Sequence, residues 1–460
     1  MHAPNGGIHA WANVFLTFSI YLICVGFQYS LGIFQSAFLL DGDLTRGLSR
    51  ADVSFAAALE SSCFLFGTVP AGLLYGRLGP RGVCLFGAAL VCVGSIVAIH
   101  ASSFGAVQAG FLLIGLGLGA PMSAAISCTM PWFDTLRATA SGISVAGSGV
   151  GAIVFGPLLQ WQVDLGGWRQ ALRFFSVVAC VGVPICAAAL RPLPRPALPA
   201  LSNESRSVDD GWVAMSETPR AASAETSPAA SETSAAPEAF PGSEPDDAPL
   251  SMWALVVQNH SMRSFMTYIG LFGGAWFVLI AHFNSAAREQ GTSADDAAVL
   301  VSVQGFSNTI WRLIVGFCAD ALKSLTKLQL LQLCCFMTAL FTALLAIPAC
   351  LKSFPFQVLF MIINGLFGGS VASLQAPIVA DLVGVHNMPA SFALIHMIQS
   401  PMVLLLPPAA GALRTLTGWP AVWASAGALV FLASCALSTI KSVRAGGGPW
   451  TLASFRCVKL

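Results

Sequence analysis

The chain has little charge. Asp, Glu, Lys and Arg make up 9% of its 460 residues, whereas a soluble globular domain carries about a quarter. Hydrophobic residues make up 56% of the chain, so the composition excludes a soluble globular protein and predicts an integral membrane protein. The formal net charge is +1 and no basic stretch is concentrated enough to displace counterions, which excludes nucleic-acid binding.

Patterns typical of metal sites and catalysis are also missing. The 13 cysteines are scattered through apolar stretches, without the CxxC pairs of zinc sites or the spacing of a disulfide framework. We interpret them as small core residues. No nucleophile and base recur at catalytic spacing, and the glycine-rich "GLGLGAP" has no following lysine to hold a phosphate. We therefore expect no enzymatic activity, no cofactor and no metal.

What the sequence does contain is a series of apolar runs long enough to cross a bilayer. No Lys or Arg precedes the first run, so we expect it to be retained rather than cleaved as a signal peptide. Twelve runs are predicted to span the membrane as helices: Trp11–Leu31, Ser54–Leu74, Val83–Ile99, Gly105–Thr129, Ala140–Leu159, Arg173–Leu190, Phe265–Phe283, Ala297–Phe317, Leu328–Ala349, Phe356–Ala380, Ser391–Leu413 and Val422–Ile440. The predicted fold class is an all-α membrane protein.

A polar segment divides these runs into six and six. Residues 191–250 are rich in Ser, Ala, Pro and Glu, a mixture that cannot bury a core, and we expect a disordered cytoplasmic linker there. The predicted domains are an N-terminal six-helix bundle at 1–190, a C-terminal six-helix bundle at 251–445 and a cytoplasmic tail at 446–460. Lys and Arg are more frequent in the loops on the side of the termini, which predicts that both termini are cytoplasmic. We expect the plasma membrane.

The two halves repeat a short pattern. "GLLYGRLGPR" (Gly72–Arg81) follows the second run and "GFCADALK" (Gly316–Lys323) follows the eighth. In each, a glycine allows neighbouring helices to approach closely, and a basic residue follows at the membrane edge. Internal duplication is how secondary transporters build a central site between two halves. We expect Gly72, Arg77, Arg81, Gly316 and Asp320 to act in conformational gating.

These segments resemble the major facilitator superfamily of transporters, and within it the monocarboxylate transporter family. "GLLYGRLGPR" resembles the superfamily's loop signature, with Gly76 where an Asp is usual, and the corresponding Asp in the second half is Asp320. "WFDTLRATASGISVAGSGVG" (Trp132–Gly151) resembles the fifth-helix signature of the family, with Thr135 and Leu136 replacing two usual bases. The resemblance implies a fold of two pseudo-symmetric six-helix bundles. The residues of this signature that we expect to act in gating are Arg137, Gly142, Gly147 and Gly151.

The resemblance also implies a substrate site. In the family, an eighth-helix Arg engages the substrate carboxylate, and Arg312 fits that position, while Asn308 stands where an Asp four residues earlier is usual. Tyr29 matches a tyrosine that lines the site, and Ile33 lies nearest the place of the family's first-helix Lys. Proton coupling by the family's usual pair of charged residues is therefore not expected.

Helical spacing supports a polar site on the eighth run. Gln304, Asn308 and Arg312 recur every four residues, which places them on one face of a helix. An Arg within a span is costly and usually faces an aqueous path, and its planar donors suit a carboxylate. The alternative is a structural Arg that bonds carbonyls or extends to the inner surface. Phe66 is a further candidate for lining the site.

Three titratable residues are candidates for carrying a coupled proton. Glu60 is the acidic residue deepest within a span, and burial disfavours its charged form unless a cation is near. We consider it a partner of Arg312, with hydrogen bonding to Ser61 or Ser62 as the alternative. His282 and His396 lie in or near predicted spans and could titrate near neutral pH.

We therefore expect a secondary active transporter of small organic anions, monocarboxylates first, that works by alternating access. We expect it to be a proton symporter, and because an Asp is missing at position 308, facilitated uniport is the alternative. Its expected partners are the anion, the proton and the lipid bilayer, without nucleic acid. One alternative is an exporter of other metabolites or drugs from the same superfamily. A second is a non-transporting membrane sensor that retains the fold.

Overall fold

Long helices account for nearly all of the described chain. The computed structural model describes residues 5–42, 44, 50–193, 255, 259–322 and 324–440. The expected linker, from residue 194 onward, and the expected tail at 446–460 lie outside the described residues, as does Lys323. The boundaries of the two predicted bundles therefore stay predictions.

The N-terminal half contains six helical spans. The helices are α1 (Ile8–Tyr29), α2 (Leu31–Leu40), α3 (Arg50–Phe66), α4 (Thr68–His100), α5 (Phe104–Thr129) and α6 (Arg137–Ala189), with a short 3-10 turn η1 (Met130–Trp132). α1 and α2 form one span that is interrupted at Ser30. α4 changes direction at Gly79, whose φ of 65° lies in the left-handed region, and α6 changes direction at Gly167, whose φ is 74°. These breaks separate spans two from three and five from six, because glycine adopts positive φ without steric cost.

The C-terminal half contains the other six spans. The helices are α8 (His260–Glu289), α9 (Ala294–Ala321), α10 (Lys327–Leu344), α11 (Pro348–Lys352), α12 (Phe354–Val383), α13 (Met388–Thr417) and α14 (Trp419–Ser438), with a 3-10 turn η2 (Val385–Asn387). α10 begins with a capping box in which Thr326 and Gln329 satisfy each other's backbone N–H groups. Short α11 joins α10 to α12.

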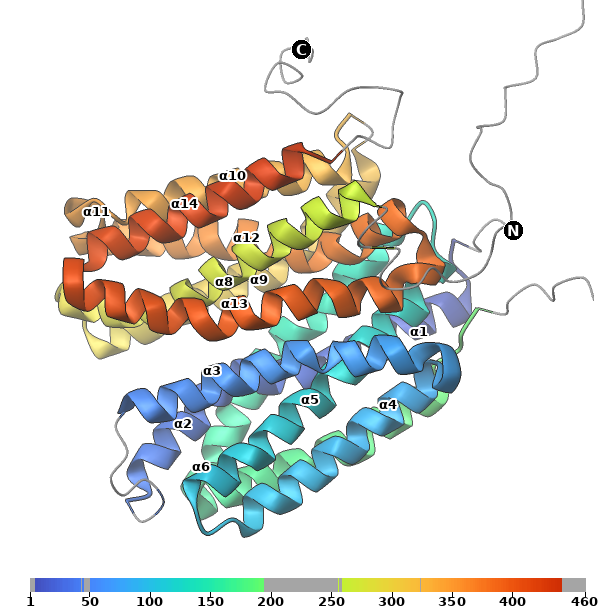
Figure 1. Cartoon of the computed structure of the whole chain (residues 1–460), viewed down its shortest axis with the longest axis horizontal. Coiled ribbons are helices and arrows are strands. Elements are labelled where there is room, and N and C mark those ends of the chain that lie inside the picture. Colours follow the sequence, from blue (N-terminus) through green and yellow to red (C-terminus); the bar gives the residue numbers. More distant parts are fainter. Residues whose placement is uncertain are drawn as a thin grey trace, which may run out of the picture. The chain divides into compact units, whose positions relative to one another are not determined.

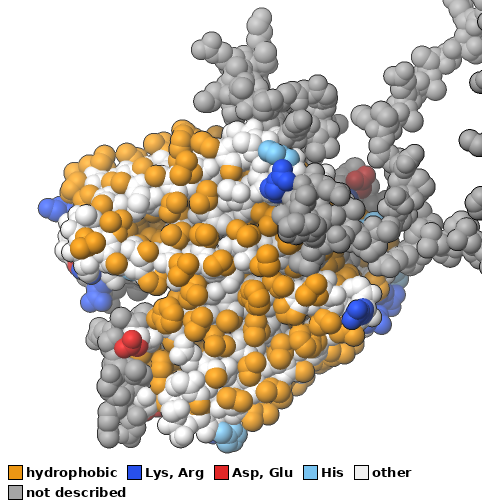
Figure 2. All heavy atoms as spheres, in the orientation of Figure 1, with side chains coloured by type: hydrophobic (Ala, Val, Ile, Leu, Met, Phe, Trp, Pro, Cys, Tyr) orange, Lys and Arg blue, Asp and Glu red, His pale blue; other side chains and the backbone are white. Residues whose placement is uncertain are grey.

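The described helices are long and apolar enough to lie in a bilayer. Nine stretches meet that description by length and hydropathy, and two of these contain the breaks at Gly79 and Gly167. α9 is less apolar because it carries Gln304, Asn308 and Arg312, and it completes the twelve spans. Figure 2 shows hydrophobic side chains spread over the visible face of the helices, with charged residues towards their ends. The all-α membrane fold with twelve spans is confirmed.

The helices of the two halves meet along two seams. α1 to α6 gather in one group and α8 to α14 in another (Figure 1). α13 packs against α3 and α4 along one seam, and α6 packs against α9 and α12 along the other. Ser62 and Ser400 join the first seam through a hydrogen bond of 2.7 Å between their hydroxyl oxygens. A large cavity lies between the seams.

Candidate functional site

A central cavity of about 1220 Å³ is lined by both halves of the chain. Its residues come from α1, α2, α3, α5 and α6 on one side and from α8, α9, α12 and α13 on the other. It extends from Tyr21 and Phe392, inside α1 and α13, to Asp52 near the start of α3 and Thr415 near the end of α13. We call the end of the molecule with Asp52 and Thr415 the cavity end.

Arg312 lies in this cavity and bridges the two halves. It projects from α9, is 5% exposed, and donates from Nη1 to the carbonyl oxygen of Val145 at 3.0 Å and to the hydroxyl of Ser148, both on α6. From Nη2 it donates to the hydroxyl of Tyr29 on α1 at 3.1 Å. Among the described residues, none accepts a hydrogen bond from Nε and no acidic side chain forms an ion pair with the guanidinium. Within the part of the chain that the structure describes, the cation is therefore buried without a counter-charge.

The polar face of α9 also forms hydrogen bonds that join α9 to α12. Gln304 Nε2 donates to Asn364 Oδ1 at 2.9 Å, and Asn308 Nδ2 donates to the Gly365 carbonyl at 3.3 Å. Gln304 and Asn308 also line the cavity, as predicted from their spacing. Their side-chain N–H groups, however, are already engaged by α12.

Glu60 is buried beside the cavity and is not paired with Arg312 in this conformation. It is 1% exposed and lines a small neighbouring pocket of about 20 Å³. Gln28 Nε2 donates to Glu60 Oε2 at 3.0 Å and to Ser61 Oγ at 2.7 Å. No described residue donates to Glu60 Oε1, which lies close to α5, since a Cβ added to Gly115 would meet it at 3.2 Å. The carboxyl therefore points into the N-terminal half.

Both histidine candidates line the cavity. His282 Nε2 lies 2.8 Å from the carbonyl oxygen of Pro407, so this nitrogen carries the proton and donates. His396 is 4% exposed, with Nε2 at 3.3 Å from Gln375 Nε2 and no described partner at Nδ1. His282 thus joins α8 to α13, and His396 joins α13 to α12.

Phe66 does not line the cavity, contrary to our expectation. Ser61, Phe64 and Leu65 of α3 do line it, whereas Phe66 is 44% exposed elsewhere. Phe66 follows Ser61 by five residues, which turns its side chain well away from the Ser61 face on a helix of 3.6 residues per turn. The adjacent Gly67 packs against the backbone of Leu116 on α5.

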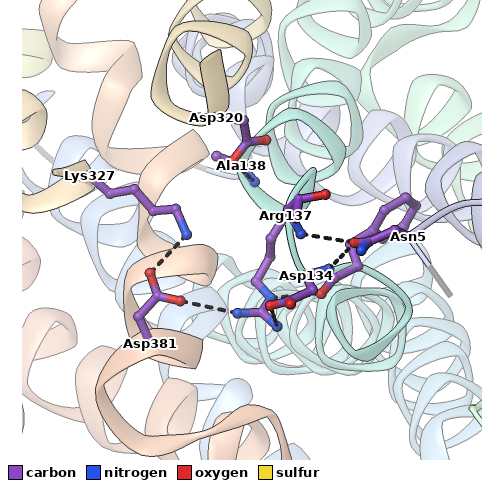
Figure 3. A network of polar contacts seen from close by, with 9 residues as sticks. Asn5, Asp134, Arg137, Ala138, Asp320, Lys327 and Asp381 are labelled. Atoms are coloured by element: carbon purple, nitrogen blue, oxygen red, sulfur yellow. Dashed lines mark hydrogen bonds and ion pairs between the residues drawn. The ribbon is translucent and has the colours of Figure 1, made fainter. Parts of the chain in front are cut away.

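The end opposite the cavity end carries a network of charges that joins the two halves (Figure 3). Arg137, at the start of α6, lies 3.1 Å from Asp381 on α12, and Lys327, at the start of α10, lies 2.8 Å from the other oxygen of Asp381. Arg137 also lies 3.6 Å from Asp134. We call this the ion-pair end. Asp381 lies at the centre of the charge network, because its carboxylate contacts cations from both halves.

Asp320 adds a second connection at the ion-pair end (Figure 3). Its carboxylate accepts hydrogen bonds from the backbone N–H groups of Ala138 at 3.2 Å and Thr139 at 2.6 Å. These groups belong to the first turn of α6, where unpaired N–H groups and the helix dipole favour an anion. A residue of α9 thus caps a helix of the other half.

The repeated glycines lie at equivalent places on the two seams. A Cβ on Gly316 would meet the carbonyl oxygen of Ala138 at 2.6 Å, in the first turn of α6. A Cβ on Gly72 would meet the carbonyl oxygen of Pro389 at 2.7 Å, in the first turn of α13. Both glycines therefore allow close approach between halves. The basic residues of the first repeat lie apart from these contacts: Arg77 is exposed, and Arg81 Nε donates to the Leu190 carbonyl at 2.9 Å.

The glycines of α6 divide between two faces. A Cβ on Gly142 would meet the Arg312 carbonyl oxygen at 2.5 Å, so this glycine lies on the seam with α9. Gly147 and Gly151 instead pack against the backbone of α1 at Phe18 and Leu22, inside the N-terminal half. Of the three glycines of this signature that we expected to act in gating, Gly142 therefore lies on the seam between the halves, and Gly147 and Gly151 do not.

Sequence reasoning missed the partners of Arg312 on α6. Ser148 belongs to the fifth-helix signature, but nothing in its spacing relates it to a residue 164 positions away. The Val145 carbonyl carries no side-chain signal at all. The pairing of Lys327 with Asp381 was likewise unforeseen, although both residues are charged and lie at helix ends.

Comparison with known proteins identifies the family. A model of the Major Facilitator Superfamily matches residues 12–353. Monocarboxylate transporter 13 of Rattus norvegicus is 24% identical over 442 residues, which cover 95% of this chain and 90% of that protein. Monocarboxylate transporter 2 of Homo sapiens is 25% identical over 449 residues, 94% of this chain and 86% of that one.

Solved structures agree on the fold. The crystal structure of the human organic anion transporter MFSD10 superposes with a TM-score of 0.65 at 16% identity, covering 93% of this chain and 99% of that one. The transporter FucP in its outward conformation superposes with a TM-score of 0.64 at 14% identity, covering 94% and 99%. The chain therefore belongs to the Major Facilitator Superfamily, and it is a secondary transporter with a distant, full-length relationship to the monocarboxylate transporters.

Proposed function

We propose that the protein transports small organic anions, with monocarboxylates as the first candidates, and that Arg312 binds the carboxylate. The observation that carries this proposal is a buried guanidinium that lines the central cavity and has no acidic partner among the described residues. An unpaired buried charge is strongly unfavourable, and an anion that enters the cavity removes that cost. The bidentate geometry of guanidinium and carboxylate supports the same ligand class.

Arg312 also links substrate binding to movement of the two halves. Its present acceptors, Val145, Ser148 and Tyr29, all belong to the N-terminal half. A carboxylate that takes over Nε and Nη2 competes with Tyr29 and loosens the contact between α9 and α1. Asn308 and Tyr29 orient the substrate from the two sides. Substrate binding therefore weakens a contact between the two halves, which must move relative to each other during alternating access.

The transported anion is accompanied by a proton, and Glu60 carries it. A buried carboxylate needs donors at both oxygens or a neighbouring cation, whereas Gln28 is the one described residue that donates to Glu60. A protonated carboxyl fits this surrounding better. Gln28 and Tyr29 are neighbours on α1. Gln28 contacts the proton carrier Glu60, and Tyr29 contacts Arg312. His282 and His396 are the other candidates.

The cavity end faces the outside and the ion-pair end faces the cytoplasm, with both termini on the cytoplasmic side of the plasma membrane. The excess of Lys and Arg in loops on the side of the termini supports this orientation. The structure then corresponds to a state that receives substrate from outside. In this state the contacts of Asp320 and Asp381 close the cytoplasmic end.

Uptake of radiolabelled monocarboxylates into vesicles, with and without an inward proton gradient, tests the proposal. We expect the gradient to stimulate uptake in the wild type and Arg312→Ala to abolish it. Arg312→Lys keeps the charge but loses the planar donor pair, so we expect partial activity. Arg173→Ala, at an exposed arginine of α6, is the matched control and should transport normally. Full transport by Arg312→Ala would show that Arg312 is structural.

A further inference from the structure

One wall of the central cavity is a stripe of large apolar side chains on α8. Phe272, Trp276 and Ile280 recur every four residues and all line the cavity. The rings of Phe272 and Trp276 are stacked, with centroids 5.9 Å apart and an angle of 18° between their planes. Such a stripe commonly packs against another helix, yet here Ile280 is 45% exposed in the cavity wall. Trp276 and Ile280 therefore offer apolar surface to a ligand, whereas Phe272, which is 4% exposed, packs behind the ring of Trp276.

The indole of Trp276 is held in place by a glycine on the neighbouring helix. A Cβ added to Gly368 of α12 would collide with the six-membered ring of Trp276. Glycine thus allows the ring to lie directly on the α12 backbone. Phe272 supports the ring from the preceding turn of α8. Because the two aromatic rings are already held in place, little side-chain entropy is lost when a ligand binds to them.

The aromatic pair lies at the depth of Asn308, one turn from Arg312. Gly365 and Gly369 of α12 both contact Asn308, and Gly368 lies between them in sequence and contacts Trp276. Asn308 precedes Arg312 by four residues, about 6 Å along a helix. Because α9 begins at the cavity end, this turn lies between Arg312 and that end. A carboxylate on Arg312 would therefore place the rest of its molecule beside Trp276.

We propose that Trp276 and Ile280, with Phe272 supporting the ring of Trp276, form a second subsite, which binds the bulky apolar body of an organic acid whose carboxylate binds Arg312. Aromatic acids fit it best, because stacked or edge-on rings add attraction beyond the burial of area. This inference rests on the proposed function and narrows its substrate class. The cavity volume of about 1220 Å³ supports it, since pockets of about 300–1,000 Å³ already hold drug-sized ligands.

Competitive uptake of two labelled acids tests the subsite: lactate, with three carbons, and 3-phenylpropionate, which has an aromatic ring. We expect wild type to take up 3-phenylpropionate with the lower KM. Trp276→Ala should reduce the preference for 3-phenylpropionate over lactate by about tenfold, as expected for the loss of an aromatic contact and its buried area. Trp161→Ala, at a tryptophan of α6 that is 55% exposed and outside the cavity, should leave the preference unchanged.

Gly368→Ala provides a second variant that leaves the tryptophan in the chain. The new methyl group displaces the indole into the cavity, so uptake of 3-phenylpropionate should fall more than uptake of lactate. If Trp276→Ala does not reach the membrane, this variant decides the question. Size-exclusion profiles of the purified variants verify that they are folded.

The outcomes separate the subsite from the transport function. Uptake of lactate but not 3-phenylpropionate by the wild type would overturn the subsite alone. Equal loss of both acids in Trp276→Ala and Gly368→Ala would overturn it as well. If wild type moves neither acid, or if Arg312→Ala moves both acids as well as wild type does, the proposed function fails, and the subsite with it.

Discussion

Asp320 on α9 accepts a hydrogen bond of 2.6 Å from the backbone N–H of Thr139 on α6, so a side chain of one half caps a helix of the other. Loss of a cap costs about 0.5–2 kcal/mol. Asp320→Asn keeps one acceptor oxygen but removes the charge, and we expect the ion-pair end to open more readily. A change of about 1 kcal/mol shifts the equilibrium between conformations about fivefold.

Alkylation of a cysteine introduced at Gln35, which lines the cavity, measures that shift. A membrane-impermeant maleimide added at the cavity end should react more slowly in Asp320→Asn, because the state with that end accessible is less populated. Asp164→Asn, at an exposed aspartate of α6, is the control. Equal rates in all three proteins would mean that the cap does not bias the conformations.

Gly76→Asp should act in the opposite direction. Gly76 follows Gly72 by four residues, as Asp320 follows Gly316, and a Cβ at Gly76 meets no atom within 4 Å. An Asp there would face the first turn of α13, where Pro389 lacks an N–H and Ala390 offers one. We therefore expect the cysteine at position 35 to be alkylated faster. The change in rate should be smaller than the change caused by Asp320→Asn. Unchanged alkylation would argue against equivalent roles for the two repeats.

Asp381→Asn should affect the ion-pair end more than Arg137→Gln does. Asp381 contacts both Arg137 and Lys327, so its neutralisation leaves two cations facing each other. Of its two pairs only the one with Arg137 joins the two halves, and a partly exposed pair contributes about 0.2–1 kcal/mol, so we expect alkylation to slow by up to about fivefold. The network would not work as described if Arg137→Gln had the larger effect.

Gly142→Ala should impair transport without unfolding the protein. Its methyl group would meet the Arg312 carbonyl oxygen at 2.5 Å, which forces α6 and α9 apart at about 1–3 kcal/mol. Gly156→Ala, on the same helix with no atom within 4 Å, is the matched control. Initial uptake rates should fall in the first variant only. Normal uptake by Gly142→Ala would show that the seam tolerates the added volume.

Glu60→Gln should separate substrate binding from proton coupling. Gln keeps an acceptor for Gln28 but cannot carry a proton. We expect uptake by wild type to rise as the pH at the cavity end falls, and uptake by Glu60→Gln to stay flat. Exchange of labelled for unlabelled substrate should continue, since it requires no net proton movement. If His396→Gln or His282→Gln flattened the profile instead, the coupling residue would be that histidine.

Much of the fold could be predicted from the sequence because membrane spans are local features. Each of the twelve runs needs about 20 apolar residues whatever its neighbours are. Glycine at 79 and at 167 marks where two spans separate, because each adopts a positive φ that interrupts the helical backbone. The polar face of α9 was also readable, because Gln304, Asn308 and Arg312 follow the helical period.

The residues that lie opposite these polar positions could not be predicted in the same way. Helical spacing shows that Arg312 shares a face with Asn308, but it does not show that Ser148 and Tyr29 lie opposite. For Glu60, the sequence suggested a pairing with Arg312, whereas the folded chain turns the carboxyl towards Gly115 on α5. The direction of a side chain on a span depends on how that helix is rotated within its bundle.

Three features follow from the amino-acid sequence alone: the chain is a helical membrane protein, its halves repeat a short pattern, and an arginine lies within a span. These follow from hydropathy, spacing and the cost of charge in a bilayer, which act over a few turns of helix. The folded chain was needed to show that no described acidic residue pairs with Arg312, that Asp320 caps α6, and that Trp276 forms part of the cavity wall. These depend on helices distant in sequence, whose packing is set by the combined fit of many side chains.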